Sequence, residues 1–439
     1  MPEAVDCLIL PQWIIPVVPE NQVLEDHCLA IRGGRIHDLL PSAQARGKYP
    51  TADVMELPGH ALIPGLINSH THAAMSLLRG LADDLPLMIW LHEHIWPAEK
   101  HWVCEEFVHD GSQLAMAEML LSGTTCFNDM YFFPDVTGRV ADTAGIRVVL
   151  GLILLDFPSV WAADTDAYLR NGLAVYDQYR DHQRIHCAFA PHAPYSVSDG
   201  PLERARTLAD ELEIPVHIHL HETHDEIVQG LQQHGNRPLE RLQQLGLLSP
   251  SLLAVHMTHL EETEIAQFAA SGGHAVHCPD SNLKLASGFC PVTRLLDAGV
   301  NVALGTDGAA SNNDLDMFSE MRTAALLAKG VAQDASALPA ARALTMATIN
   351  GARALGIAEQ TGSLEVGKSA DLVAVNLQTL YSQPVYQPIS QLVYATGRDQ
   401  VTQVWVAGRQ LVRNGELTTL DKSSILARAA SWRDRIIDE

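Results

Sequence analysis

The stretch IPGLINSHTH, residues Ile63–His72, joins an apolar run to two histidines that are one residue apart. In an extended strand, side chains at positions i and i+2 point to the same side. His70 and His72 can therefore bind one ion if the strand ends in a cavity, and neutral imidazole is the commonest metal ligand in proteins. The alternative is a pair of surface histidines in a loop. We predict a buried strand that presents two metal ligands at its end.

From Ala61 onward, short apolar runs alternate with amphipathic stretches. The runs predict eight strands: Leu62–Asn68, Thr124–Asn128, Val148–Ile153, Ile185–Ala190, Val216–Leu220, Leu252–Val255, His274–His277 and Val302–Leu304. Helical spacing of apolar residues predicts helices between them: Phe107–Leu121, Leu202–Leu212, Asp225–Gln233, Glu262–Ala270 and Val292–Ala298. This α/β alternation favours a parallel sheet closed into a (β/α)8 TIM barrel. An open, doubly wound sheet is the alternative, but no G-x-G-x-x-G follows a strand, which disfavours a dinucleotide site.

The two ends of the chain have β character instead. A Gly33-Gly34 turn lies between two short apolar runs near the N-terminus, and an Ala407-Gly408 turn lies between two more near the C-terminus, so both regions predict hairpins. Because the termini of compact chains often lie close together, we expect the two ends to form one small composite β-sandwich domain. The predicted division is 1–60 for its N-terminal part, 61–361 for the barrel and 362–439 for its C-terminal part. One helix is expected over 338–355, and a closing helix over Ser423–Ile437.

The composition excludes several classes of partner. The net charge is −23, from 52 acidic and 29 basic residues, which makes nucleic acid and anionic membrane poor partners. No run of 18 apolar residues is present, so no transmembrane helix is expected, and the first residues lack the basic region of a signal peptide. The seven cysteines include no C-x-x-C pair, which fits reduced thiols and a cytoplasmic location.

Further candidate metal ligands follow other predicted strands. His219 stands in the run Val216–Thr223 (VHIHLHET), and Asp307 stands in Gly305–Gly308 (GTDG). The carboxyl ends of barrel strands all face one pocket, so these side chains are expected to meet His70 and His72. Three imidazoles and one carboxylate suit zinc or a similar divalent ion and leave one position open for water. Water on such an ion ionises near neutral pH and becomes a nucleophile.

Three residues near that position are candidates for proton transfer. Asp307 can take a proton from the water, Glu222 can pass one to the substrate, and His256 can polarise the attacked group or orient the nucleophile. Each has a structural alternative: Asp307 as a turn residue, Glu222 as a first-turn carboxylate of a helix, and His256 as a hydrogen-bonded core histidine. These alternatives do not explain why all three follow strands. His217 and His221 are expected to be structural.

Two further groups are candidates for substrate contact. Glu99 lies in Trp96–Lys100 (WPAEK), after the first barrel strand, with a solvated helix cap as its alternative. His192 lies in Ala190–Tyr195 (APHAPY), where two prolines favour an extended loop. A carbamylated lysine at this point would bridge two metals, whereas the histidine here favours a site for a single metal.

Several of these motifs together resemble the amidohydrolase superfamily, and most closely its 5′-methylthioadenosine/S-adenosylhomocysteine deaminases, which are related to the chlorotriazine hydrolases. The resemblance covers nearly the whole chain. Its motifs are Pro64–His72 (PGLINSHTH), Trp96–Lys100 (WPAEK), Ala190–Tyr195 (APHAPY), His219–Thr223 (HLHET), Ser281–Leu285 (SNLKL) and Gly305–Asn312 (GTDGAASN).

The resemblance implies a role for each matching residue. The implied ligands of a single zinc ion, with Fe²⁺ or Mn²⁺ as other candidates, are His70, His72, His219 and Asp307. Glu222 would protonate the ring nitrogen, His256 would assist the hydroxide, and Asp307 would be the base for the water. Glu99 would bind ribose hydroxyls and His192 would contact the nucleoside. The implied reaction is attack on C6 of an adenine nucleoside, with loss of ammonia to give the inosine analogue.

One departure from the family pattern concerns the substrate tail. Some members carry arginines after the third strand, whereas residues Leu152–Trp161 (LILLDFPSVW) contain none. A homocysteine carboxylate would lack its bidentate partner there, and an apolar methylthio group should fit better beside the leucine, phenylalanine and tryptophan side chains. We therefore expect methylthioadenosine to be preferred over S-adenosylhomocysteine.

Two other functions remain open on the sequence. One is a triazine hydrolase or guanine-type deaminase of the same superfamily, and the other is a barrel that binds metal without catalysis. Glu99 together with His192 favours a ribosyl substrate over the first. Glu222, His256 and Asp307 argue against the second, because metal storage needs no proton shuttle. Barrels of this size often form homodimers, which gives the expected oligomer by analogy.

Overall fold

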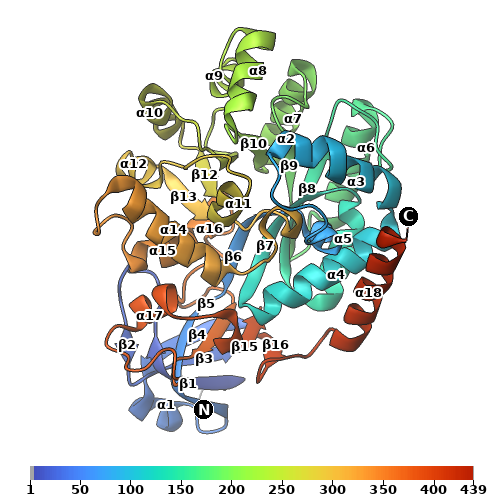
Figure 1. Cartoon of the computed structure of the whole chain (residues 1–439). Coiled ribbons are helices and arrows are strands. Elements are labelled where there is room, and N and C mark those ends of the chain that lie inside the picture. Colours follow the sequence, from blue (N-terminus) through green and yellow to red (C-terminus); the bar gives the residue numbers. More distant parts are fainter. Residues whose placement is uncertain (1–3, 439) are drawn as a thin grey trace.

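The chain, seen in a computed structural model that describes residues 4–438, is built around two β-sheets (Figure 1). One has eight strands, all parallel where they pair, with helices around its outside. The other has nine strands and lies below it in Figure 1, where strands of the N-terminal and C-terminal segments pair. The predicted barrel and the predicted β region shared by both chain ends are thereby confirmed, whereas the domain division at residues 60 and 361 stays a prediction.

The barrel strands run in simple sequence order around the sheet. They are β6 (Leu66–Thr71), β7 (Thr124–Tyr131), β8 (Arg147–Leu154), β9 (Ile185–Pro191), β10 (Val216–Leu220), β11 (Leu252–His256), β12 (His274–His277) and β13 (Asn301–Leu304). They are buried on both faces, as expected for parallel strands covered by helices.

The first and last strands approach each other at their carboxyl ends. The backbone N–H of Asp307 donates to the carbonyl oxygen of His70 at 3.0 Å. The Asn68 amide donates to the Thr306 hydroxyl at 2.7 Å and accepts from the Thr306 backbone N–H at 3.0 Å. The barrel is therefore nearly closed at the end where the predicted ligands lie.

The first barrel strand differs from the prediction. The residues from Leu62 to Pro64 belong to β5 (Asp53–Pro64) of the other sheet, and β6 begins only at Leu66. Gly65 forms the junction: a Cβ there would lie 1.9 Å from the Thr125 hydroxyl oxygen, so only glycine permits this close approach. One continuous apolar run thus supplies strands to two sheets.

The nine-stranded sheet has the order β17-β16-β15-β14-β5-β1-β3-β4, with β2 paired to β1. Its N-terminal members are β1 (Cys7–Ile14), β2 (Leu24–Glu25), β3 (His27–Arg32), β4 (Arg35–Pro41) and β5, and its C-terminal members are β14 (Leu372–Asn376), β15 (Val401–Val406), β16 (Arg409–Arg413) and β17 (Glu416–Leu417). The central pair β5–β14 joins the two ends of the chain. The buried Arg147 of β8 forms an ion pair with Asp371 at 3.0 Å and so fastens the barrel to this sheet.

The helices around the barrel mostly follow the predicted spans. They include α4 (Glu105–Leu121), α5 (Pro134–Ala144), α6 (Thr165–Tyr179), α7 (Asp199–Leu212), α8 (His224–His234), α9 (Pro238–Gln244), α10 (Glu262–Ser271), α12 (Val292–Asp297) and α14 (Met317–Ala332). The single helix predicted over 338–355 is wrong, because two helices are present, α15 (Ala340–Met346) and α16 (Ile349–Ala354). The break has a tertiary cause: the Ala347 carbonyl accepts from the Ile67 N–H of β6 at 2.8 Å.

A long segment between β6 and β7 passes over the carboxyl end of the barrel. It contains short helical turns, a 3-10 turn at Ala73–Leu78, α2 (Leu87–Ile89), a π turn at Trp90–Ile95 and α3 (Trp96–Trp102). We call Leu87–Trp102 the cover segment. The C-terminal helix α18 (Lys422–Ile437) packs against α4 near it (Figure 1). None of the helices in residues 4–438 is long and apolar enough to cross a membrane.

Candidate metal centre and active-site cavity

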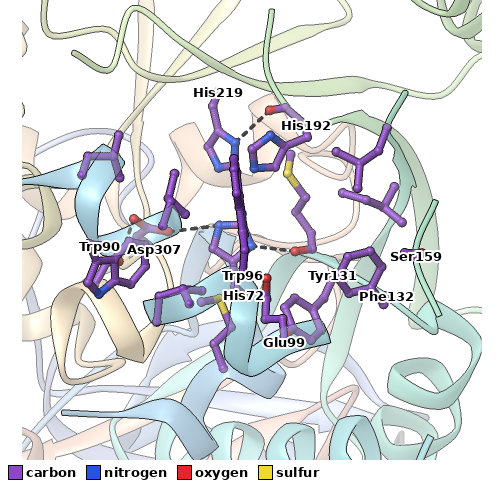
Figure 2. Close-up of a pocket in the computed structure, with 18 of the residues that line it drawn as sticks. His72, Trp90, Trp96, Glu99, Tyr131, Phe132, Ser159, His192, His219 and Asp307 are labelled. Carbon is purple, nitrogen blue, oxygen red and sulfur yellow. Dashed lines mark hydrogen bonds and ion pairs between the residues drawn. The ribbon is translucent and has the colours of Figure 1, made fainter. Parts of the chain in front are cut away.

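A cavity of ≈ 610 Å³ opens at the carboxyl end of the barrel, beneath the cover segment. Its wall combines polar side chains from strand ends with apolar side chains from the cover segment and from residues 153–160. In Figure 2, Asp307 lies to the left, His219 and His192 lie at the top, Tyr131 and Phe132 lie to the right, and Glu99 lies below the central His72. Such a mixture of apolar lining and a few convergent polar groups is typical of small-molecule sites.

Four predicted ligands converge at the base of this cavity, although 237 positions separate the first from the last. The Nε2 atoms of His70 and His72 each lie 3.2 Å from Asp307 Oδ1. His219 Nε2 lies 3.2 Å from His70 Nε2. All three rings are buried or nearly so. Two overlapping groups of three have ligand atoms close enough to hold an ion: His70, His72 and His219, and His70, His256 and Asp307.

The hydrogen bonds behind two of these rings hold their Nδ1 atoms, so that Nε2 of each ring faces the other candidate ligands. His72 Nδ1 donates to the Met130 carbonyl at 2.6 Å, and His219 Nδ1 donates to the His192 carbonyl at 2.8 Å (Figure 2). A neutral imidazole with its proton on Nδ1 presents a lone pair at Nε2. Burial lowers the pKa of His219 well below its usual value, which keeps its ring neutral. The residues present thus fit a divalent cation.

Asp307 is held by hydroxyl donors that the sequence did not single out as site residues. Its Oδ2 accepts from Ser281 at 2.7 Å and from Ser311 at 2.9 Å, and its Oδ1 accepts from the Gly308 N–H at 2.8 Å. Burial acts to raise the pKa of Asp307, but hydrogen bonds from His70 and His72 and their charge hold it well below the usual value. The carboxylate is thus ionised and fixed in direction. Ser281 and Ser311 lie inside the SNLKL and GTDGAASN motifs, and this was their only sequence signal.

Glu222 and His256 lie next to the ligand cluster. Their side chains face each other, with 3.8 Å between Glu222 Oε2 and His256 Nε2. Burial raises the pKa of Glu222, which brings proton release closer to neutral pH. His256 Nδ1 donates to Asn282 Oδ1 at 2.8 Å, so Nε2 is the ring nitrogen on the side of Glu222.

His217 and His221 have partners within the protein. His217 Nε2 lies 2.9 Å from His70 Nδ1, behind the ligand cluster. His221 Nε2 accepts from the Leu239 N–H at 3.0 Å, and its Nδ1 donates to the His259 carbonyl at 3.2 Å. Neither ring lines the cavity.

The backbone is left-handed where three strand ends turn into the cavity. His221 has φ 54°, His256 has φ 75° and Asp307 has φ 64°. Residues other than glycine rarely adopt such values, and strain of this kind is concentrated at functional sites. These bends aim neighbouring side chains at the ligand cluster. No local sequence pattern predicted them.

Glu99, on α3, and His192, directly after β9, both line the cavity. Burial raises the pKa of Glu99 to about 7, although the nearby Tyr131 hydroxyl and His72 act to lower it. His192 Nδ1 lies 2.8 Å from the Ser196 hydroxyl, and the His192 ring packs against the His219 ring at 4.9 Å between centroids. The carboxylate and the ring thus flank the space above the metal ligands.

The apolar wall differs in one respect from the prediction. Phe157 and Val160 line the cavity as expected for residues 152–161, but Trp161 does not. Its ring packs against Tyr168 instead, at 5.8 Å between centroids. Two tryptophans of the cover segment, Trp90 and Trp96, line the cavity in its place.

Comparison with known proteins identifies the family. The model of the amidohydrolase family matches residues 61–411. The chain belongs to the amidohydrolase family. Within it, a relative from Teredinibacter turnerae named 5-methylthioadenosine/S-adenosylhomocysteine deaminase is 53% identical over 432 residues, which are 98% of either chain. A relative of the same name from Saccharophagus degradans is 50% identical, over 98% of this chain and 97% of its own. The resemblance seen in the sequence motifs is confirmed.

Solved structures agree with this assignment. The crystal structure of an adenosine deaminase from Xanthomonas campestris with bound zinc is 52% identical, covers 100% of either chain and superposes with a TM-score of 0.99. A zinc complex of atrazine chlorohydrolase from Arthrobacter aurescens has a TM-score of 0.90 over 97% of this chain and 99% of its own, at 24% identity, so the likeness there is one of fold. As an amidohydrolase, the chain is a hydrolase that acts on carbon–nitrogen bonds.

Proposed function

We propose that this amidohydrolase is a zinc-dependent deaminase of adenine nucleosides and that 5′-methylthioadenosine is its preferred substrate. The observation that carries the proposal is a single cavity. In it, the candidate metal ligands and the buried Glu222 lie opposite Glu99 and an apolar wall. Such a cavity offers one partner for each part of a methylthioadenosine molecule. The names of the relatives at 53% and 50% identity support the same substrate class.

Zinc would be held by the four convergent side chains, His70, His72, His219 and Asp307. When bound, it would supply a Lewis acid that makes water a nucleophile near neutral pH. The donor set of three imidazoles and one carboxylate is the composition that such a catalytic ion needs.

The proton transfers are assigned to groups that already face the cavity. Asp307 accepts a proton from the attacking water, because its carboxylate is ionised and its second oxygen is occupied by two serine hydroxyls. Glu222 gives a proton to the adenine ring nitrogen beside C6, since burial raises its pKa toward the range in which a carboxyl can act as an acid. His256 holds the nucleophile through its free Nε2. Asp307 then passes its proton to the amino group, which leaves C6 as ammonia. The hydroxyl on C6 gives its proton to Glu222, so that the inosine analogue forms and both carboxyl groups return to their starting states.

The nucleoside is oriented by residues outside the ligand cluster. Glu99 accepts hydrogen bonds from the ribose hydroxyls, for which an ionised carboxylate is a strong partner. His192 contacts the nucleoside from the opposite side, where its ring borders the metal ligands. These two groups favour a ribosyl substrate over a free base or a triazine ring.

The 5′ tail is expected to lie against apolar side chains. Phe157, Val160 and Trp96 offer such a surface, and burying a methylthio group there is favourable by about 25 cal/mol per Å² of apolar area. Among the described residues that line the cavity, Lys100 is the only lysine or arginine, and it belongs to the exposed side of α3. A homocysteine carboxylate therefore has no bidentate partner there, which is the basis for the preference.

The test is ammonia release from a panel of substrates by the zinc-loaded protein. The panel contains methylthioadenosine, S-adenosylhomocysteine, adenosine, guanine and a chlorotriazine. We expect the highest kcat/KM for methylthioadenosine, then adenosine. A clear preference for S-adenosylhomocysteine would contradict the tail assignment and would point to Lys100 as the carboxylate partner, which Lys100→Met would then reduce. Turnover of only guanine or the triazine would refute the nucleoside assignment.

We also infer that the protein is cytoplasmic, since its seven cysteines include no C-x-x-C pair, and that it is a homodimer. Leu380, Tyr381 and Tyr386, on the connection that follows β14, have exposed fractions of 95%, 78% and 83%. Three large apolar side chains so exposed on one short connection are typical of a subunit interface. The molar mass from light scattering tests this inference: twice the mass of the 47.8 kDa chain is expected, and the chain mass alone would contradict it.

A further inference from the structure

Glu226 lies behind the cavity and takes no part in the chemistry described so far. Its side chain belongs to the first turn of α8, and the residue is 3% exposed. Its two carboxylate oxygens accept hydrogen bonds from two successive backbone N–H groups. Oε1 accepts from His221 at 2.9 Å and Oε2 accepts from Glu222 at 2.7 Å.

These two N–H groups belong to a strained part of the backbone. His221 is left-handed, with φ 54°, immediately before Glu222. The carbonyl side of Glu222 is held as well, because the Thr258 hydroxyl donates to it at 2.7 Å. The Glu222 main chain is therefore fixed at its N–H by Glu226 and at its C=O by Thr258, and its side chain projects from between them into the cavity.

Helix capping alone does not account for Glu226. The N-cap of α8 is Thr223, whose hydroxyl accepts from the Glu226 N–H at 3.3 Å. In the usual capping box, a glutamate at this position bonds the N–H of the cap residue itself. The Glu226 carboxylate instead bonds the two residues that precede the cap. Its hydrogen bonds thus hold the segment that carries Glu222 and contribute little to the start of the helix.

We infer that Glu226 is a positioning residue that fixes the direction of Glu222 toward the substrate. The inference rests on the proposed role of Glu222 as the group that protonates the ring. The carboxyl group offers one acceptor oxygen to each N–H. Burial raises the pKa of Glu226 to about 8, and the two N–H groups act to lower it because they favour the ionised form. Glutamine has the same shape but only one acceptor, so its NH₂ group would face a backbone N–H donor in a buried place.

The experiment compares wild type, Glu226→Gln and Glu226→Asp, each loaded with zinc, with methylthioadenosine as substrate. Loss of one buried hydrogen bond should lower kcat about 10- to 100-fold in Glu226→Gln, while KM and zinc content stay within about twofold. Glu226→Asp keeps both acceptors on a shorter side chain, so we expect an intermediate kcat. It also serves as the test if Glu226→Gln does not fold. The inference would be overturned if, in a variant that folds, KM or zinc content changed as much as kcat.

Asp164→Ala is the matched control for a lost helix cap. Asp164 caps α6, where its side chain accepts from the Ala167 N–H at 2.8 Å, and it does not line the cavity. This variant should lower the melting temperature and leave kcat unchanged. If Asp164→Ala lowers kcat as much as Glu226→Gln does, the loss of kcat in both variants reflects a loss of general stability, and the inference fails.

A double-mutant cycle separates this inference from the proposed function. If Glu226 acts through Glu222, adding Glu226→Gln to Glu222→Gln should leave the residual rate unchanged, because the positioned carboxyl is already gone. A further loss equal to that in the wild-type background would refute the positioning role alone. A Glu222→Gln variant with wild-type kcat would instead refute the proposed role of Glu222, whatever Glu226 does.

Discussion

The metal end of the cavity and the cover segment are built in different ways. At the metal end, the side chains proposed as ligands stand at barrel strand ends and are oriented by hydrogen bonds, as His72 is by the Met130 carbonyl. The cover segment consists of short helical turns whose cavity side is mainly apolar, with Glu99 as its one carboxylate in the cavity wall. This difference suggests that the barrel fixes the reaction and that the inserted segment selects the substrate. Substitutions in the two regions should therefore differ in their effects on turnover and on substrate binding.

The largest effect is expected at the metal end. Glu222→Gln keeps the shape of the side chain but removes the transferable proton, so kcat for methylthioadenosine should fall about 10²–10⁴-fold. Zinc content, measured by atomic absorption, should be unchanged, because the His256 ring and not a ligand faces Glu222. Activity near the wild-type level would remove Glu222 from the mechanism.

A smaller and selective effect is expected from the cover segment. Glu99→Gln replaces the charged acceptor proposed for the ribose, which should lower kcat/KM for methylthioadenosine about 10-fold or more. Slow turnover of free adenine, which has no ribose, should be unaffected. Equal losses for both compounds would mean that Glu99 takes part in the reaction itself. The cover segment would then do more than select the substrate.

The same carboxylate predicts a pH dependence. Burial raises the pKa of Glu99 to about 7, and the charge of a nearby zinc ion acts in the opposite direction, so the group should titrate at or below pH 7. As the pH falls through this value, Glu99 becomes protonated and loses its charged acceptor, so KM should rise toward acid. In Glu99→Gln, the KM profile should lose this step. A step of the same size in the variant would rule out Glu99 as its source.

The smallest effect on activity is expected at the helix that braces the cover segment. Trp432 of α18 is 1% exposed, donates to Asp110 at 3.0 Å and packs against Trp102 at the end of α3. Trp432→Phe removes that hydrogen bond and should lower the free energy of unfolding by about 1–3 kcal/mol, as measured by denaturant titration. KM should rise at most a few fold and kcat should not change. A large loss of kcat would mean that the contact between α18 and the cover segment also affects the metal end.

The sequence predicted the metal end far better than the cover segment. His70, His72, His219 and Asp307 follow predicted strands, and barrel geometry brings strand ends together whatever the details of packing. The replacement of Trp161 by Trp90 and Trp96 in the cavity wall was missed, because it depends on how one connection folds over another. The left-handed bend at Asp307 and the role of Gly65 were also missed, since both follow from close approaches between distant segments.

Zinc titration of the metal-free protein tests the central claim most directly, that four side chains hold one catalytic ion. Deamination of methylthioadenosine should rise linearly with added zinc and stop rising at one zinc per chain. His70→Ala should bind no zinc at that concentration and show no activity, while His221→Ala, outside the cavity wall, should keep one bound zinc if it folds. Full activity without metal, or one firmly bound zinc in His70→Ala, would contradict the account.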